Sequence, residues 1–226
     1  MNNLHLCTHY GFGDYVMCYG LVRELSRRYD EIILYVIPHC SELHIDNIKR
    51  LYSSISNVRI TTENPALRDG VVYLGYNKFF EAVRNDKTTQ IQRYIYAQFD
   101  IPVEAMWDSF YFERNSSLEK DIYYRIGLRD GEDYIFLHDD PSRGFIINRD
   151  YVRDTRIVRL ADIKDVSILD SLYLVEKAAE VHTFNTGLLS FIDQIGIVHD
   201  NLNYHRYVRP LAFEQPILKL KWNIYE

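Results

Sequence analysis

The feature that most constrains the fold is a repeated succession of a short apolar strand, a turn and a helical segment. Residues 31–37 (EIILYVI) form a continuous apolar run, the pattern of a strand buried on both faces of a parallel sheet. Apolar runs at residues 4–8, 58–60 and 71–74 predict further strands. Helical patterns occur at residues 16–28, 41–52 and 88–99. The first half is therefore predicted to be a doubly wound α/β structure.

The same succession returns after an irregular stretch at residues 100–117, which contains Pro102 and Asn115-Ser116-Ser117. Beyond this stretch, strands are predicted at residues 134–137, 156–159 and 181–184, and helices at residues 118–128, 168–179 and 188–195. We expect two β/α domains, residues 1–105 and residues 106–226.

Composition excludes several classes of protein. The 226 residues include 26 Lys and Arg against 32 Asp and Glu, a net charge of −6, so no nucleic-acid partner is expected, because phosphate binding needs a basic excess. The three cysteines form no C-x-x-C motif, and no apolar run approaches the ~18 residues of a membrane span. The start of the chain also lacks the basic segment of a secretory signal. We expect a cytoplasmic protein without a membrane span. The 19 tyrosines suit either a sugar or base site or a Tyr-rich core, and the core is the better interpretation.

The first candidate site is the turn His9-Tyr10-Gly11-Phe12-Gly13-Asp14, between the first strand and the first helix. Ligands of open α/β sheets bind at the carboxyl ends of strands, and Gly11 and Gly13 allow close approach of a ligand to the backbone. The third glycine of a dinucleotide motif is missing. The alternative interpretation of Asp14 is a helix cap.

Two further turns follow predicted strands. In the loop His138-Asp139-Asp140-Pro141-Ser142-Arg143-Gly144, a hydroxyl, a guanidinium and exposed amides could hold phosphate; the alternative is a Pro-containing surface turn. Asn185-Thr186-Gly187 precedes a helix whose N-terminus could bind an anion, or Asn185 could simply cap it.

Other polar groups have weaker signals. Asp139-Asp140 and residues 130–133 are better explained as solvated turns than as a metal site. Residues 204–210 (YHRYVRP) could clamp a phosphorylated or sugar ligand, or form the packed end of the domain. The tail Lys219-Leu220-Lys221-Trp222 is predicted to be a docking segment rather than a membrane anchor.

Together the first and third motifs resemble the ADP-heptose:lipopolysaccharide heptosyltransferases. Members of this family open with a strand, a G-x-G-D turn and a helix, matched here by Gly11-Phe12-Gly13-Asp14. They later carry D-T-G-L-x-H after a strand, matched by Asn185-Thr186-Gly187-Leu188-Leu189-Ser190. Two positions depart from the motif, with Asn185 in place of Asp and Ser190 in place of His. The chain also resembles small glycosyltransferase-like proteins of viruses and bacteria.

The resemblance implies a compact GT-B-like fold, with two Rossmann-like β/α domains facing each other across a cleft. The first domain would take a glycan or lipid-linked sugar acceptor, and the second would bind a nucleotide-sugar donor. Asp14, assisted by His9, would be the catalytic base. No metal or other cofactor is expected. The donor-binding residues would be Gly11, Gly13, His138, Ser142, Arg143, Gly144, Asn185, Thr186, Gly187 and Ser190.

Two other functions stay open at this point. A non-catalytic nucleotide-sugar or glycan-binding protein is favoured by the replacements at Asn185 and Ser190. A nucleotide-dependent oxidoreductase is disfavoured by the missing third glycine.

Overall fold

A computed structural model describes residues 2–8, 11–36, 42–75, 90–209 and 215–226, and the side chains of residues 42–44 are not described. Its contacts divide the chain into two compact units. Unit 1 comprises Met1–Phe112 and Ala212–Ile217, and unit 2 comprises Glu113–Leu211 and Leu218–Glu226, each without the residues just excluded. Within the described ranges, no helix has the length and apolar character to cross a membrane. Each unit is described by itself below.

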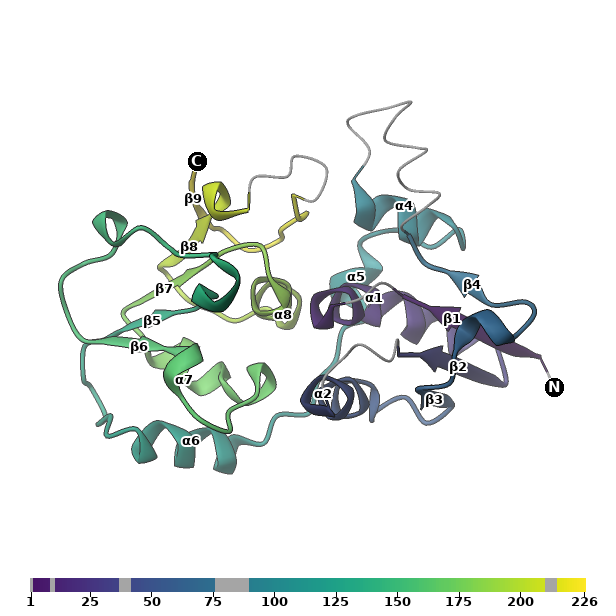
Figure 1. Cartoon of the computed structure of the whole chain (residues 1–226), viewed down its shortest axis with the longest axis horizontal. Helices are drawn as coiled ribbons and strands as arrows, with labels where there is room; N and C mark the ends of the chain where they lie inside the picture. The colour runs from purple at the N-terminus through teal and green to yellow at the C-terminus, as the bar shows by residue number, and fades with distance from the viewer. Residues whose placement is uncertain (1, 9–10, 37–41, 76–89, 210–214) are drawn as a thin grey trace. The chain divides into compact units, whose positions relative to one another are not determined.

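Unit 1 contains a parallel sheet with the strand order β3-β2-β1-β4 (Figure 1). The strands are β1 (Asn3–Cys7), β2 (Glu31–Tyr35), β3 (Val58–Thr61) and β4 (Val72–Tyr73). Leu6 of β1 lies opposite Leu34 of β2 on one side and opposite Val72 of β4 on the other. Leu6 and Leu34 are completely buried, as expected for a central strand with neighbours on both edges.

The helices of unit 1 are α1 (Phe12–Leu25), α2 (Glu42–Tyr52), α4 (Ile91–Ala97) and α5 (Ala105–Asp108), with a short 3₁₀ helix, η1, at Pro65–Leu67. Helix α1 packs against the other three α-helices. Its closest approach is at Gly20, where a Cβ atom would lie 2.1 Å from the Ala105 carbonyl oxygen. The contact with α5 therefore requires glycine at position 20. Helix α5 thus belongs to unit 1, whose first segment ends at Phe112.

Buried tyrosines stabilise the core of unit 1 through their hydroxyl groups. The Tyr96 hydroxyl accepts from the Leu21 amide at 3.1 Å and donates to the Met17 carbonyl at 3.0 Å, so it is inserted between two α1 backbone groups that are four residues apart. The Tyr52 hydroxyl donates to the carbonyl of Tyr15 at 2.7 Å. These rings are fully buried, and burial raises the pKa of Tyr52 and Tyr96 well above the usual value. The core interpretation of these tyrosines is confirmed.

Unit 2 contains a second, separate parallel sheet with the order β6-β5-β7-β8-β9 (Figure 1). Its strands are β5 (Ile135–Leu137), β6 (Ile157–Arg159), β7 (Glu180–Thr183), β8 (Leu202–His205) and β9 (Asn223–Tyr225). The α-helices are α6 (Ser116–Arg125), α7 (Leu172–Lys177) and α8 (Gly187–Ile195). The 3₁₀ helices are η2 (Pro141–Arg143), η3 (Arg149–Tyr151), η4 (Leu160–Asp162), η5 (Ile168–Asp170) and η6 (Arg206–Val208). The described strands therefore form two parallel sheets, one in each unit, and each sheet alternates with helices along the chain.

The predicted helix over residues 168–179 is wrong as a single element. Ser167 caps the short helix η5 by accepting from the Leu169 amide at 3.1 Å. Ser171 ends it, because its hydroxyl donates to the Ile168 carbonyl at 2.7 Å. Only Leu172–Lys177 then forms an α-helix. Serine side chains that bond to nearby backbone compete with the helical ladder, and this competition divides the segment in two.

The tail that follows residue 217 is held by a buried carboxylate on α8. Asp193 is 1% exposed and accepts from the backbone amides of Lys219 and Leu220 and, at 3.1 Å, from Trp222 Nε1. The chain then continues into β9, which pairs with β8. The predicted docking segment thus packs on its own unit through Asp193.

Strands β8 and β9 were missed in the sequence because one face of this sheet is polar. His182 on β7 and His205 on β8 lie on that face, with His182 Nδ1 2.9 Å from His205 Nε2 and His182 Nε2 3.0 Å from the Glu180 carboxylate. If His182 donates to Glu180, its Nδ1 accepts from His205. Nδ1 of His205 then remains a buried acceptor without a hydrogen-bond partner among the described residues. The ring of Tyr225 stacks on His205 at 4.7 Å.

This pair predicts that unit 2 loses stability in mild acid. Burial lowers the pKa of His205 to about 4, and it also lowers the pKa of His182 although Glu180 opposes the shift. The unfolded chain binds protons near pH 6.5, so the stability present above that pH is lost as the pH falls toward 4. From pH 7 to pH 5 we expect His205 to contribute a loss of about 2 kcal/mol.

The measurement is urea unfolding at pH 7 and pH 5, followed by Trp222 fluorescence in a Trp107→Phe background so that the signal reports on unit 2. His205→Gln keeps a donor for His182 but does not titrate, so its unfolding free energy should change less between the two pH values. An identical change with and without His205 would contradict the prediction.

Candidate functional site

The order of the strands in unit 2 places two of the predicted motifs beside each other. The chain leaves β5 for β6 on one side and later returns to β7 on the other side of β5. Ligands of open α/β sheets bind at such a point of reversal, outside the carboxyl ends of the strands. Leu137 pairs with His182 across β5 and β7, and the His138 amide donates to the His182 carbonyl at 2.9 Å. Residues 138–144 and 185–187 therefore start from adjacent strand ends.

A stack of rings connects these two segments. His138 stacks on Phe184 with ring centroids 6.0 Å apart, and Phe145 contacts the same ring at 5.4 Å. Burial lowers the pKa of His138 to about 4, so its imidazole is neutral at pH 7. The Nδ1 atom is buried and has no hydrogen-bond partner in the part of the chain that the structure describes. This imidazole nitrogen is therefore a buried polar group whose hydrogen-bond partner the described residues do not supply.

The N-terminus of α8 lies at the same edge of the sheet. Thr186 is its N-cap residue and Gly187 its first residue, yet the Thr186 side chain makes no capping bond. The Thr186 hydroxyl is buried without a partner among the described residues. Ser190 lies in the first turn, with its amide 3.3 Å from the Thr186 carbonyl. Amides and an unpaired hydroxyl at a helix N-terminus are groups of the kind that bind an anion such as phosphate.

The loop after β5 is organised by Asp140. Its carboxylate accepts from the Ser142 hydroxyl at 2.6 Å and from Arg143 Nε at 2.5 Å. Although burial opposes the shift, these hydrogen bonds lower the pKa of Asp140. Gly144 then ends the turn at φ +77°, in the left-handed region that glycine adopts without strain. The two predicted phosphate-binding side chains, Ser142 and Arg143, are therefore both bonded to Asp140.

The interpretation of Asp139 as part of a solvated turn is wrong. Asp139 is 2% exposed, and its Oδ1 lies 3.1 Å from Arg159 Nε at the end of β6. Burial raises the pKa of Asp139, and Arg159 opposes that shift. The ion pair fixes the base of the loop to the neighbouring strand, so the loop starts from a rigid position.

Unit 1 has its own point of reversal beside β1, and Asp14 lies near it. Asp14 is half-buried in the first turn of α1, and its Oδ2 accepts from the Gly11 amide at 2.9 Å. The alternative interpretation of Asp14 as a cap is confirmed as a structural role, because this bond satisfies a helix N-terminal donor. Gly13 is in the same turn, and His9 lies outside the described residues. Asp14 therefore lies in the turn of helix that follows β1, at the carboxyl end of the strand as the sequence predicted.

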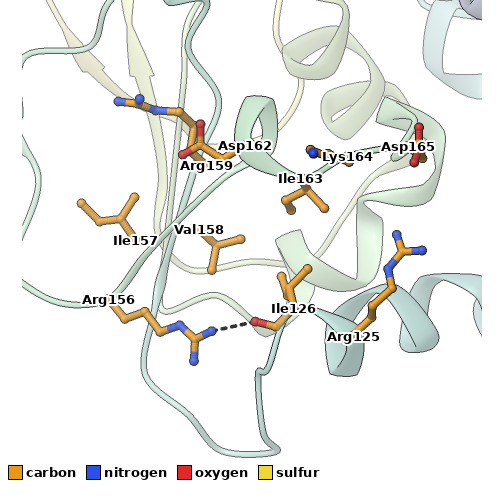
Figure 2. Close-up of a pocket in the computed structure, with 10 residues that line it drawn as sticks. All are labelled: Arg125, Ile126, Arg156, Ile157, Val158, Arg159, Asp162, Ile163, Lys164 and Asp165. Carbon is orange, nitrogen blue, oxygen red and sulfur yellow. Dashed lines mark hydrogen bonds between the residues drawn. The ribbon is translucent and has the colours of Figure 1, made fainter.

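A pocket of about 460 Å³ in unit 2 involves none of the predicted site residues (Figure 2). It lies beside the edge strand β6 and is lined by Arg125, Ile126, Arg156, Ile157, Val158, Arg159, Asp162, Ile163, Lys164 and Asp165. Figure 2 shows Arg156 donating to the carbonyl of Ile126, at 2.9 Å. Arg156 also pairs with Glu132, so much of the basic charge of this pocket is already neutralised.

The architecture defines the class: the chain is an α/β protein with parallel, Rossmann-like sheets. No protein-family model matches it, and no curated protein matches it significantly. Among solved structures it is similar to "the glycosyl transferase family 9 from Veillonella parvula DSM 2008", with a TM-score of 0.51. The sequences are 9% identical, and the match covers 90% of this chain and 79% of that one. At this identity the likeness establishes the fold.

Proposed function

We propose that the chain is a glycosyltransferase that transfers a hexosyl or heptosyl group from a nucleotide-sugar donor to a glycan or lipid-linked sugar. The observation that carries the proposal is the pair of unpartnered polar groups at the reversal point of unit 2, His138 Nδ1 and the Thr186 hydroxyl. They lie beside the N-terminus of α8, where a diphosphate would complete their hydrogen bonds. The fold shared with a glycosyl transferase family 9 structure supports it.

In this proposal the two units have different tasks. The acceptor hydroxyl gives its proton to Asp14 as its oxygen bonds to the anomeric carbon of the donor, assisted by His9. The bond from that carbon to the donor phosphate breaks, and the electron pair remains on the diphosphate. Arg143, Ser142 and the amides of Thr186 and Gly187 would stabilise this charge, with Asn185 and Ser190 near the same helix end. Oriented donors at a developing charge are commonly the largest catalytic contribution, and no metal would be required.

The first test is binding of the donor. A thermal-shift screen with nucleoside diphosphates and their sugars should find a stabilising ligand, since a ligand at 100 times its Kd adds about 2.7 kcal/mol. Thr186→Val removes the unpaired hydroxyl and keeps the shape, so it should weaken that ligand by about 1 kcal/mol. Thr155→Val in the same unit is the matched control and should bind normally. Equal affinity in both variants would exclude Thr186 from the site.

The second test is turnover. The enzyme should release nucleoside diphosphate from the donor when an acceptor is present, and should do so undiminished in EDTA. Donor binding without any release would favour the alternative, a non-catalytic nucleotide-sugar or glycan-binding protein. That alternative is favoured by the bonds of Ser142 and Arg143 to Asp140, which occupy the groups that would stabilise the leaving group.

A further inference from the structure

We infer that the Asp140 carboxylate is an internal competitor of the donor diphosphate, which has to displace it in order to bind the loop after β5. The inference rests on the proposed function and deepens it. Asp140 Oδ1 accepts from the Ser142 hydroxyl at 2.6 Å and from the Arg143 amide at 3.3 Å, and Oδ2 accepts from Arg143 Nε at 2.5 Å. A hydroxyl, a backbone amide and a guanidinium are donors of the kind that hold phosphate groups. The carboxylate therefore occupies the place of an anion.

The backbone of this loop is held in place without the carboxylate. The Asp140 amide donates to the Phe145 carbonyl at 2.7 Å, and the Phe145 amide donates to the Asp140 carbonyl at 2.9 Å. The amides of Arg143 and Gly144 also donate to carbonyls within the loop, at 3.2 and 3.1 Å. The Asp140 side chain can therefore turn away while the backbone of Ser142 and Arg143 stays in position. A preformed set of donors lowers the cost of binding a ligand.

The ion pair between Asp140 and Arg143 is one that a stronger anion can break. The side chain of Arg143 is 63% exposed and that of Asp140 is 25% exposed. Ion pairs this close to water contribute little to stability, because solvent and salt screen them. A diphosphate carries more negative charge and more acceptor oxygens than one carboxylate, so it forms stronger charge-assisted bonds with the same guanidinium. Since the Asp140 side chain is already partly exposed, water can solvate its carboxylate after displacement.

Two further groups distinguish a diphosphate from the internal carboxylate. His138 Nδ1 and the Thr186 hydroxyl are buried and lack hydrogen-bond partners in the described part of the chain, although Asp140 is only two residues from His138. Both groups lie just beyond the adjacent ends of β5 and β7. A ligand anion that bonds to them gains interactions that Asp140 does not make. The carboxylate therefore sets a threshold, because a weaker anion leaves the loop bonded to Asp140.

The alternative interpretation of Asp140 is a structural cap, because it is the N-cap residue of η2 and accepts from the Arg143 amide. Asp140→Asn separates the two roles. Asparagine caps helices about as well as aspartate does, and it keeps an oxygen for the Ser142 hydroxyl. It lacks the negative charge that opposes a diphosphate. A cap alone predicts an unchanged Kd for a diphosphate, whereas an internal competitor predicts a lower Kd.

The experiment is isothermal titration of the full chain with inorganic pyrophosphate, UDP and ADP. Asp140→Asn should lower the Kd of pyrophosphate and of the preferred nucleoside diphosphate about 10-fold. In an Arg143→Gln background the same substitution should have a smaller effect, because the cation for which the two anions compete is absent. The matched control is Asp133→Asn, which removes the carboxylate of an exposed pair with Arg153 in the same unit and should bind like the wild type. Thermal unfolding verifies that each variant is folded, and Asp140→Ser is a second uncharged cap variant.

Each outcome decides a separate claim. If the folded Asp140→Asn variant binds pyrophosphate no more tightly than the wild type does, or if neither protein binds any diphosphate, the inference is wrong. An equal gain in affinity with and without Arg143 would also contradict it. If Asp140→Asn binds a diphosphate more tightly but no donor supports transfer, the internal competitor stands and the glycosyltransferase proposal fails. If transfer occurs and Asp140→Asn leaves diphosphate affinity unchanged, the reverse holds.

Discussion

Asp14→Asn is expected to reduce glycosyl transfer by about 100-fold or more while leaving donor affinity nearly unchanged. Asparagine retains a side-chain oxygen that can accept from the Gly11 amide, as Asp14 does at 2.9 Å. The start of α1 should therefore be preserved, since this bond from the third helical residue to the N-cap amide needs only an oxygen acceptor. What is lost is the ability to take a proton from the acceptor hydroxyl. The measurements are donor affinity by titration calorimetry and diphosphate release under saturating donor.

The control is Asp46→Asn, an exposed carboxylate on α2, which should leave transfer unaffected. The two roles considered for Asp14, proton acceptor and helix cap, predict opposite results for Asp14→Asn. If Asp14 serves only as the cap that the structure contains, transfer should survive the substitution at nearly full rate. Full activity of Asp14→Asn would therefore remove the general-base proposal and leave donor binding by unit 2 intact.

Asp193→Ala is expected to lower the free energy of unfolding of unit 2 by about 3 kcal/mol or more. The substitution leaves three donors without their acceptor, namely the amides of Lys219 and Leu220 and the indole nitrogen of Trp222. The buried indole nitrogen costs about 1–3 kcal/mol when it loses its partner, and the two half-buried amides add to this loss. The tail should detach from α8, and the pairing of β9 with β8 should weaken, because β9 directly follows the segment that Asp193 holds.

Trp222 provides the readout, because its 8% exposure should increase when the tail is released. Urea unfolding by circular dichroism gives the stability, and the emission maximum of Trp222 in a Trp107→Phe background gives the environment of the tail. Asp200→Ala, an exposed carboxylate in the same unit, is the matched control. A variant at position 193 with wild-type stability and an unshifted emission maximum would show that the carboxylate is not a structural anchor.

The sequence predicted the elements whose residues are apolar on a regular period, and the misses have a common cause. Strands β1, β2, β5 and β7 appeared as apolar runs because both faces of a parallel sheet are buried. Strand β8 was missed because Asn203 and His205 interrupt its pattern. These polar side chains are buried among other polar groups on one sheet face, a long-range arrangement that no local pattern records.

The sequence identified the segments that form the candidate site, but it did not show which of these segments lie side by side. The turns at Asp14, Ser142 and Thr186 follow strands, which local pattern identifies. The closeness of residues 138–144 and 185–187 depends on the adjacency of β5 and β7 in the sheet, and strand order is set by tertiary packing. The predicted cleft between domains and the division at residue 105 stay predictions.

The tyrosine core has a consequence for how unfolding can be observed. A phenol whose hydroxyl bonds to a buried carbonyl, as Tyr52 does to Tyr15, can ionise only after the surrounding packing opens. Burial also raises the pKa of Tyr134 in unit 2. Above the pH at which exposed tyrosines ionise, the slow growth of phenolate absorbance therefore reports the opening rate of each core. The buried tyrosines are therefore intrinsic absorbance probes of local unfolding, and no label has to be added.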